Sequence, residues 1–176
     1  MNKFPNLRNP FHFIATLGGI GKLPFAPGTW GSATALILFI VLSHYVNMLI
    51  VGSIVILFSI WICERASIGL DDKDHKSIVI DELAGMWLAL MPALYLSSQT
   101  SRTSYAVIAF IFFRLFDIWK PFPISYFDKN FKNGFGIVLD DLLAGLFAIL
   151  PAWFLVQLAF VLSLIHISEP TRPEDI

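Results

Sequence analysis

Five long apolar segments dominate the sequence and restrict what it can fold into. They occupy residues 33–42, 48–62, 78–96, 105–119 and 137–164. Hydrophobic residues make up 56% of the 176 residues and charged residues only 14%, whereas soluble domains carry about 25% charged residues. We therefore expect a single-domain integral membrane protein. Several segments are shorter than the roughly 20 residues that span hydrocarbon, so either flanking residues complete these spans or some helices are tilted or only partly inserted.

The positive charges follow an alternating pattern along the chain. They gather before the first segment, between the second and third, and between the fourth and fifth, whereas the other connections hold only Arg102. By the positive-inside rule, the three basic connections face the cytoplasm. This topology places six charged residues at the cytoplasmic ends of their helices, at one depth: Asp81, Glu82, Arg114, Asp117, Asp140 and Asp141.

An acidic pair opens two of the segments, and the two openings resemble each other. Residues 78–85 and 137–145 align with one residue inserted. Asp81 with Gly85, and Asp141 with Gly145, share a helix face at a spacing of four residues. Because a small residue lets a neighbouring backbone approach closely, this pattern is expected to draw the carboxylates of the two helices together.

The negative charge of so many acidic residues in an apolar chain must be offset by positive charge. Six carboxylates are expected to converge with the cations Arg114 and Lys120, and these are Asp81, Glu82, Asp117, Asp128, Asp140 and Asp141. Two like charges 4 Å apart repel by about 4 kcal/mol at an effective dielectric constant of 20. The cluster therefore raises its own pKa values, disperses or binds a cation. Oxygen ligands without Cys or clustered His favour Mg²⁺ over zinc.

Structural roles explain part of the same pattern. Acids near helix N-termini stabilise the helix dipole and cap the first turn, but Asp117 lies near a helix C-terminus, where an anion is unfavourable. Arg114, Asp117 and Lys120 follow one another at intervals of three residues and could form an ion-pair ladder. Lys120 precedes Pro121 and ends its helix, which presents the ammonium group at the membrane surface, where a phosphate can meet it.

Two loops carry further candidates. Residues 27–32 precede a helix and offer backbone N–H groups, with the hydroxyls of Thr29 and Ser32, to a substrate phosphate. A plain N-cap is the simpler role for this loop. Asp74 and His75 lie in a polar connection, where they are either solvated or serve as a general acid or a support for a metal ligand.

Four ordered motifs resemble one known family. They are Gly21-x-x-Pro24-x-x-Pro27-Gly28-Thr29-x-Gly31-Ser32, Asp74-His75-x-Ser77-Ile78-Val79-x-Asp81-Glu82-x-x-Gly85-Met86-Trp87, Phe113-Arg114-x-x-Asp117-x-x-Lys120-Pro121-x-Pro123-Ile124-x-x-x-Asp128 and Gly134-x-Gly136-Ile137-x-x-Asp140-Asp141-x-x-Ala144-Gly145. The motifs lie between residues 21 and 145, within a resemblance that covers about residues 10–161. In order and spacing they resemble phosphatidylglycerophosphatase A.

The resemblance implies a Mg²⁺-dependent phosphatase of the bacterial inner membrane, multi-pass and with its active site on the cytoplasmic side. Such an enzyme would hydrolyse the phospholipid substrate phosphatidylglycerophosphate to phosphatidylglycerol and phosphate during phospholipid biosynthesis. The resemblance also implies a compact all-α fold of about five to six helices, with one central helix surrounded by the others.

On this hypothesis the catalytic set is Asp81, Glu82, Asp117, Lys120, Asp140 and Asp141. Its five acids are the candidate Mg²⁺ ligands, and Glu82 or Asp117 serves alternatively as a base. Arg114 and Lys120 would hold phosphate oxygens and offset charge in the transition state. Asp128, with Asp74 and His75, would support these groups from outside. The attacking group is either a water molecule or an aspartate that forms a phosphoenzyme.

Other classes of function would require a different distribution of the acidic residues, or give them no role. A cation or proton transporter is the main alternative, but it would spread its acids through the depth of the bilayer. A structural or assembly protein leaves the acidic surplus unexplained. The net charge of −1 gives no reason to expect a nucleic-acid partner.

The last residues differ from the rest of the chain. Residues 163–176 become polar and proline-containing, and residues 164–173 resemble a translated sequencing-adapter sequence. We therefore expect the family domain to cover residues 1–162 and the tail, 163–176, to be non-native.

Overall fold

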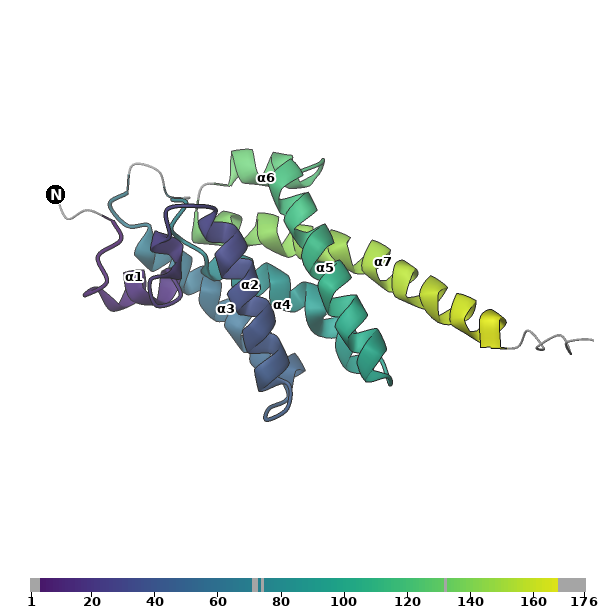
Figure 1. The fold of residues 1–176 in the computed structure, drawn as a ribbon. Helices are drawn as coiled ribbons and strands as arrows, with labels where there is room; N and C mark the ends of the chain where they lie inside the picture. The colour runs from purple at the N-terminus through teal and green to yellow at the C-terminus, as the bar shows by residue number, and fades with distance from the viewer. Residues whose placement is uncertain (1–3, 71–72, 74, 132, 168–176) are drawn as a thin grey trace, which may run out of the picture.

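The computed structural model describes residues 4–70, 73, 75–131 and 133–167. These residues form seven α-helices and two short 3-10 helices (Figure 1), and no strand occurs within the described ranges. In order they are α1 (Pro10–Ala15), η1 (Ile20–Lys22), α2 (Pro27–Leu42), α3 (Met48–Ala66), α4 (Ile80–Leu90), η2 (Met91–Tyr95), α5 (Gln99–Trp119), α6 (Ile124–Asn130) and α7 (Gly134–Ile167). The all-α class is confirmed. Seven α-helices replace the expected five to six, since α6 forms inside a basic connection.

Capping side chains and prolines set the helix ends. Asn9, Asn47 and Ser98 accept hydrogen bonds from backbone N–H groups in the first turns of α1, α3 and α5. Proline is the first residue of both α1 and α2, a position where its missing N–H is not needed. Helix α5 ends at Trp119, because Lys120 takes a left-handed conformation (φ 44°) and Pro121 follows it. Lys120 therefore ends the helix, as the sequence predicts.

Helix α4 is in contact with four other helices, α2, α3, α5 and α7 (Figure 1). Nine of its eleven residues are buried. In its second half, the indole Nε1 of Trp87 donates to the carbonyl of Ala35 in α2 (2.9 Å), and the hydroxyl of Tyr105 in α5 donates to the carbonyl of Ala89 (3.0 Å). These bonds satisfy polar groups in an apolar core and fix α4 relative to its neighbours.

The contact between α4 and α7 depends on two glycines. A Cβ atom on Gly85 would meet the carbonyl oxygen of Asp141, and a Cβ atom on Gly145 would meet the carbonyl oxygen of Gly85. Only residues without a side chain allow two helix backbones to approach this closely. The predicted role of the two glycines is confirmed, and the second turn of α4, at Gly85, lies against the part of α7 between Asp141 and Gly145.

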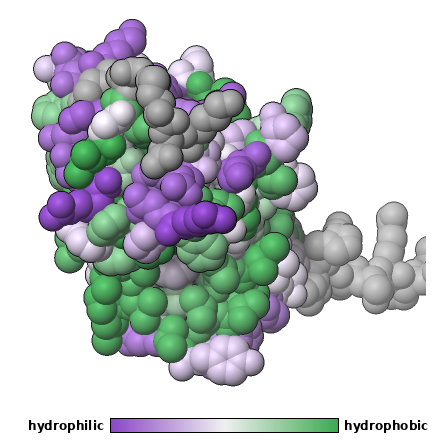
Figure 2. All heavy atoms as spheres, turned by 90° about the vertical axis from the view of Figure 1, so that its left-hand side faces the viewer, coloured by the Kyte–Doolittle hydropathy of each residue, from purple (hydrophilic) through white to green (hydrophobic). Residues whose placement is uncertain are grey.

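The outer faces of the long helices are apolar. Two helical stretches, Met48–Ala66 and Gly134–Ser163, are long and apolar enough to cross a membrane by length and composition, and only 28% and 22% of their apolar windows are buried. Leu57 and Leu150 are 70% and 74% exposed. Figure 2 shows hydrophobic residues covering the lower part of one face, with most hydrophilic residues above them. Apolar surface of this extent is typical of contact with a membrane or a partner.

Two prolines in apolar segments have different effects. Helix α4 ends at Leu90 and η2 begins at Met91, one residue before Pro92, so the segment 78–96 is not one continuous α-helix. Helix α7 instead continues through Pro151 to Ile167, past the expected domain boundary at residue 162. Residues 168–176 of the expected tail lie outside the described residues.

Candidate active site

Three carboxylates from two helices converge where α4 meets α7. Asp81 and Glu82 lie in the first turn of α4, and Asp141 lies in the second turn of α7. One carboxylate oxygen from each of the three lies within 4.8 Å of the others. Asp81 and Asp141 are each 4% exposed. The two acidic pairs singled out in the sequence therefore contribute to one buried cluster, which we call the acidic triad.

The surroundings of the triad disfavour full ionisation. The pKa of Glu82 is raised to about 8, chiefly because burial removes its carboxylate from water, and the charges of Asp141 and Asp117 act in the same direction. A hydrogen bond with Asp81 and the charge of Arg114 act against this rise. Asp81 also accepts a hydrogen bond from the backbone N–H of Glu82 (3.0 Å), so it serves the first turn of α4 structurally as well.

Buried oxygens indicate what the triad can bind. Oε2 of Glu82 and Oδ1 of Asp141 are buried and accept no hydrogen bond from any described residue. Leaving such oxygens unsatisfied in a protein interior is costly. A cation between the three carboxylates would offset their repulsion and bind these oxygens, and an all-oxygen donor set suits a hard divalent ion. The acidic triad can therefore hold a metal ion.

Arg114 of α5 lies beside the triad and is held by two neighbours. Its Nη1 donates to Oδ2 of Asp117 (2.5 Å) and to the hydroxyl of Ser32 (3.2 Å), and that hydroxyl donates in turn to the carbonyl of Gly28 (2.8 Å). A Cβ atom on Gly28 would meet both Oε1 of Glu82 and the guanidinium group. The start of α2 therefore packs directly on the site, and its Gly28 leaves room for both charged groups.

Lys120 forms a second group of charges next to the triad. Its Nζ donates to Oδ1 of Asp128 in α6 (2.7 Å) and to Oδ2 of Asp140 in α7 (2.5 Å). Burial lowers the pKa of Lys120, but the charges of Asp140 and Asp128 outweigh this effect and raise it above its ordinary value. The lysine thus remains protonated and joins the end of α5 to α6 and α7.

The structure separates the predicted residues into these two groups. Asp117 pairs with Arg114 as an ion-pair ladder requires, but Lys120 forms its ion pairs with Asp128 and Asp140 instead. Asp140 therefore adjoins the triad in sequence and faces Lys120 with one carboxylate oxygen. Ser32 is fully buried against Arg114, whereas Thr29 is half-buried one turn earlier.

The polar connection before α4 contributes little that can be described. Asp74 lies outside the described residues. Nδ1 of His75 accepts a hydrogen bond from the backbone N–H of Ser77 (3.2 Å), and its ring lies 4.8 Å from that of Phe4. This bond stabilises the turn that leads into α4.

One functional contact escaped the sequence reasoning. A carboxylate oxygen of Glu64, at the end of α3, accepts a hydrogen bond from the backbone N–H of Gly134 (2.6 Å). A Cβ atom on Gly134 would collide with the backbone of Glu64. The two residues are 70 positions apart, and no local sequence pattern predicts their contact. It fixes the start of α7, and with it the position of Asp141.

Comparison with known proteins gives a consistent result. Residues 13–156 match the phosphatidylglycerophosphatase A family. A phosphatidylglycerophosphatase A from Haemophilus influenzae is 39% identical over 148 residues, which cover 82% of this chain and 88% of that protein. The enzyme of that name from Escherichia coli is 35% identical over 144 residues, covering 79% of each chain.

A third relative has a different name. This Bacteroides thetaiotaomicron protein is 34% identical over 142 residues, covering 77% of this chain and 86% of its own length, and is provisionally named a phosphatidylinositol-3-phosphatase. No solved structure matches the chain. The match over 13–156, with two relatives above 30% identity along most of their length, confirms the resemblance seen in the motifs. The chain belongs to the phosphatidylglycerophosphatase A family.

Proposed function

We propose that this chain is a Mg²⁺-dependent lipid phosphatase that hydrolyses phosphatidylglycerophosphate to phosphatidylglycerol and phosphate. Two relatives that cover most of its length carry the name of this activity. The observation on which the proposal depends is the acidic triad: one oxygen from each of its three carboxylates lies within 4.8 Å of the others, and Glu82 and Asp141 each retain a buried oxygen with no hydrogen bond from any described residue. Mg²⁺ suits a site with hard oxygen donors beside a substrate phosphate.

In the proposed mechanism the triad of Asp81, Glu82 and Asp141 holds the ion. When bound, Mg²⁺ would polarise the phosphate and lower the pKa of a water molecule. Arg114 would bind phosphate oxygens, because only Nη1 of its five-donor guanidinium is engaged by Asp117 and Ser32, and its buried Nε has no hydrogen-bond partner in the described part of the chain. Its charge would offset the negative charge of the transition state.

The remaining candidates take supporting roles in this proposal. Asp117 and Asp140 stay candidate ligands, but each already pairs with a cation, so the triad takes precedence. Lys120 would approach the phosphate from the membrane surface while Asp128 fixes its ammonium group. Ser32 would orient Arg114, and Thr29 would offer its hydroxyl to the phosphate. His75 and Asp74 would support the triad from the preceding turn.

Two routes break the P–O bond to the glycerol. In one, Glu82 or Asp117 takes a proton from water as its oxygen attacks phosphorus, and the departing glycerol oxygen gains a proton. In the other, an aspartate oxygen attacks first and water then hydrolyses the phosphoenzyme. Trapping a phosphoenzyme with labelled substrate would decide between the two routes.

The proposed location follows from the charge pattern and the apolar helices. We place the protein in the bacterial inner membrane as a multi-pass protein, with α4 as the helix that the others surround. The triad and Lys120 would then face the cytoplasm, beside the basic connections. A transporter is less well supported, because the acids of α4, α5 and α7 form one cluster at one end of these helices.

Phosphate release from phosphatidylglycerophosphate in detergent micelles, with Mg²⁺ and with EDTA, tests this function. Asp81→Asn and Asp141→Asn each remove one charged ligand and should lower kcat by at least about 100-fold. Asp128→Asn is the matched control, because Lys120 keeps its ion pair with Asp140 in this variant. Its kcat should fall much less than that of the Asp81 and Asp141 variants. Release that is unaffected by EDTA, or near-normal turnover of the Asp141 variant, would contradict the proposal. Phosphatidylinositol 3-phosphate, tested in parallel, measures substrate preference.

A further inference from the structure

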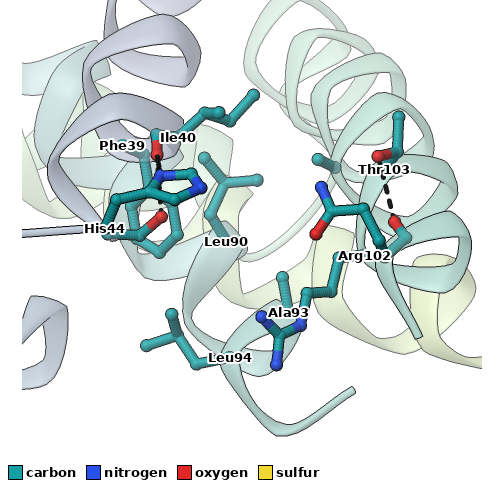
Figure 3. A pocket seen from close by; sticks show the side chains of 11 residues that line it. Phe39, Ile40, His44, Leu90, Ala93, Leu94, Arg102 and Thr103 are labelled. Carbon is teal, nitrogen blue, oxygen red and sulfur yellow. Dashed lines mark hydrogen bonds between the residues drawn. The ribbon is translucent and has the colours of Figure 1, made fainter. Parts of the chain in front are cut away.

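A cavity lies at the opposite end of the helices from the acidic triad. It has a volume of about 150 Å³ and is lined by the end of α2, the junction of α4 and η2, and the start of α5 (Figure 3). Helix α2 begins beside the triad and ends at this cavity, and α5 runs the other way. Arg102 at the cavity and Arg114 at the triad lie twelve residues apart on α5, or about 18 Å at 1.5 Å per residue. The cavity is therefore separate from the candidate active site.

The wall and the rim of the cavity differ in chemistry. Phe39, Leu90 and Ala93 provide a buried apolar wall. The rim carries His44 and Arg102, and Figure 3 shows both side chains bordering the cavity with Leu90 between them. An apolar wall with a polar, cationic rim suits an amphiphile better than a small soluble ion.

Hydrogen bonds hold both rim groups in place. Nδ1 of His44 bonds to the carbonyl of Ile40 (2.7 Å), which requires the proton on Nδ1 and leaves Nε2 free to bind elsewhere. Nε of Arg102 donates to the carbonyl of Leu96 (2.6 Å). The two terminal NH₂ groups of Arg102 have no hydrogen bond or ion pair with any residue that the structure describes. One edge of the guanidinium group is thus held by the hydrogen bond of Nε, and the other edge, with the two NH₂ groups, is available to a ligand.

Among the described residues at this end of the helices, no acidic side chain is available to neutralise Arg102. Residues 40–48 and 91–104, which form this end of the helices, contain Arg102 as their one charged residue. The ion pairs among the described residues all lie at the other end. Tyr45 and Tyr95 flank the cavity region and are 81% and 71% exposed, and exposed tyrosines are typical of the level of lipid headgroups.

We propose that this cavity binds the headgroup of an anionic phospholipid. The phosphate would pair with the terminal NH₂ groups of Arg102, whose planar fork matches phosphate oxygens. Nε2 of His44 would bind a headgroup hydroxyl, and the first part of an acyl chain would lie against the wall formed by Phe39 and Leu90. This lipid site is distinct from the acidic triad and does not depend on the hydrolytic activity.

Lipid binding to the purified full-length chain in neutral detergent tests the proposal. The probes are dioleoylphosphatidylglycerol, dioleoylphosphatidylcholine and inorganic phosphate, with bound lipid counted by native mass spectrometry. Arg102→Gln should weaken phosphatidylglycerol binding by at least about tenfold, because bonds to a charged group are lost. Arg8→Gln removes the same charge from the connection before α1 and should leave binding unchanged. Phosphate release in micelles should stay normal in both variants, which shows that they fold.

The outcomes distinguish a phospholipid from free phosphate as the ligand of the cavity. Equal binding by the Arg102 and Arg8 variants would overturn the proposal, as would displacement of the lipid by equimolar inorganic phosphate, which would assign the cavity to a free anion. If Arg102→Gln does not fold, Arg102→Lys takes its place. This variant keeps the charge but loses the fork and its anchor, so it should bind phosphatidylglycerol more weakly than the wild type; unchanged binding would refute the role given to the guanidinium.

Discussion

Replacing Gly85 by alanine should disable the site without touching any charged group. Alanine in a helix interior is normally more stable than glycine by about 0.5–1 kcal/mol. At Gly85, however, the new Cβ would lie 2.7 Å from the carbonyl carbon of Asp141 and 2.8 Å from the ring of Phe113, where ordinary contacts begin at 3.4 Å. The carbonyl oxygen of Asp141 would lie closer still, and because this neighbour is backbone, α7 must move away from α4 by about 1 Å to relieve the contact.

Such a shift separates Asp141 from Asp81 and Glu82. A misplacement of about 1 Å can cost about 100-fold in rate, so we expect Gly85→Ala to lower kcat by about 30- to 100-fold and to weaken Mg²⁺ binding in parallel. Overpacking should also reduce the free energy of unfolding by about 1–3 kcal/mol. Initial rates of phosphate release across a Mg²⁺ titration, together with a thermal unfolding curve, measure these effects.

Gly52→Ala is the matched control. The Cβ atom at this position in α3 would meet the terminal methyl group of Met91, a flexible side chain that can move aside. Its activity should stay within about twofold of the wild type, since nothing near the triad shifts. Gly145→Ala, which presses on the carbonyl of Gly85, should reproduce the Gly85 defect. Wild-type activity and metal affinity in a folded Gly85 variant would refute the argument that backbone proximity assembles the triad.

Three further predictions follow from individual contacts. Ser32→Ala removes a hydroxyl that holds Arg114 and should lower kcat/KM by about tenfold, whereas Ser59→Ala, also buried but bonded only within α3, should not. Mg²⁺ affinity, measured by calorimetry, should rise as the pH increases from 6 to 9, because below about 8 the ion must displace the proton of Glu82; a flat profile would contradict this. Glu64→Ala should lower the unfolding free energy by about 1–2 kcal/mol through loss of the bond to Gly134, and an unchanged melting curve would exclude that role.

The sequence could predict what depends on local chemistry. The acidic pairs, the glycines four residues after Asp81 and Asp141, and the proline that follows Lys120 all act within a few residues of where they stand. The expected position of one pair was wrong, because α7 begins at Gly134 and Asp140 and Asp141 lie in its second turn instead of opening it. The resulting expectation, that Asp81 and Asp141 approach each other through Gly85 and Gly145, is confirmed by the contact between α4 and α7. Helix periodicity and small-residue packing suffice for that inference.

Partner choice could not be predicted, because it depends on where distant helices meet. Lys120 lies at an ion-pair spacing from Asp117, yet it bonds to Asp128 in α6 and Asp140 in α7, two helices that the fold brings beside the end of α5. The bond between Arg114 and Ser32 joins residues 82 positions apart. Helix α6 was also missed, because seven residues in a charged connection give too short a pattern to read.

The division of the acidic triad between α4 and α7 has a consequence for biosynthesis. A ribosome makes Asp81 and Glu82 about sixty residues before Asp141, and most of the apolar part of α7 is made later still. Until that last helix docks in register against Gly85, the nascent chain has two of the three carboxylates and no assembled metal site. Competence for catalysis should therefore appear only at the final insertion step, and fragments that stop before residue 134 should be inert however well they integrate.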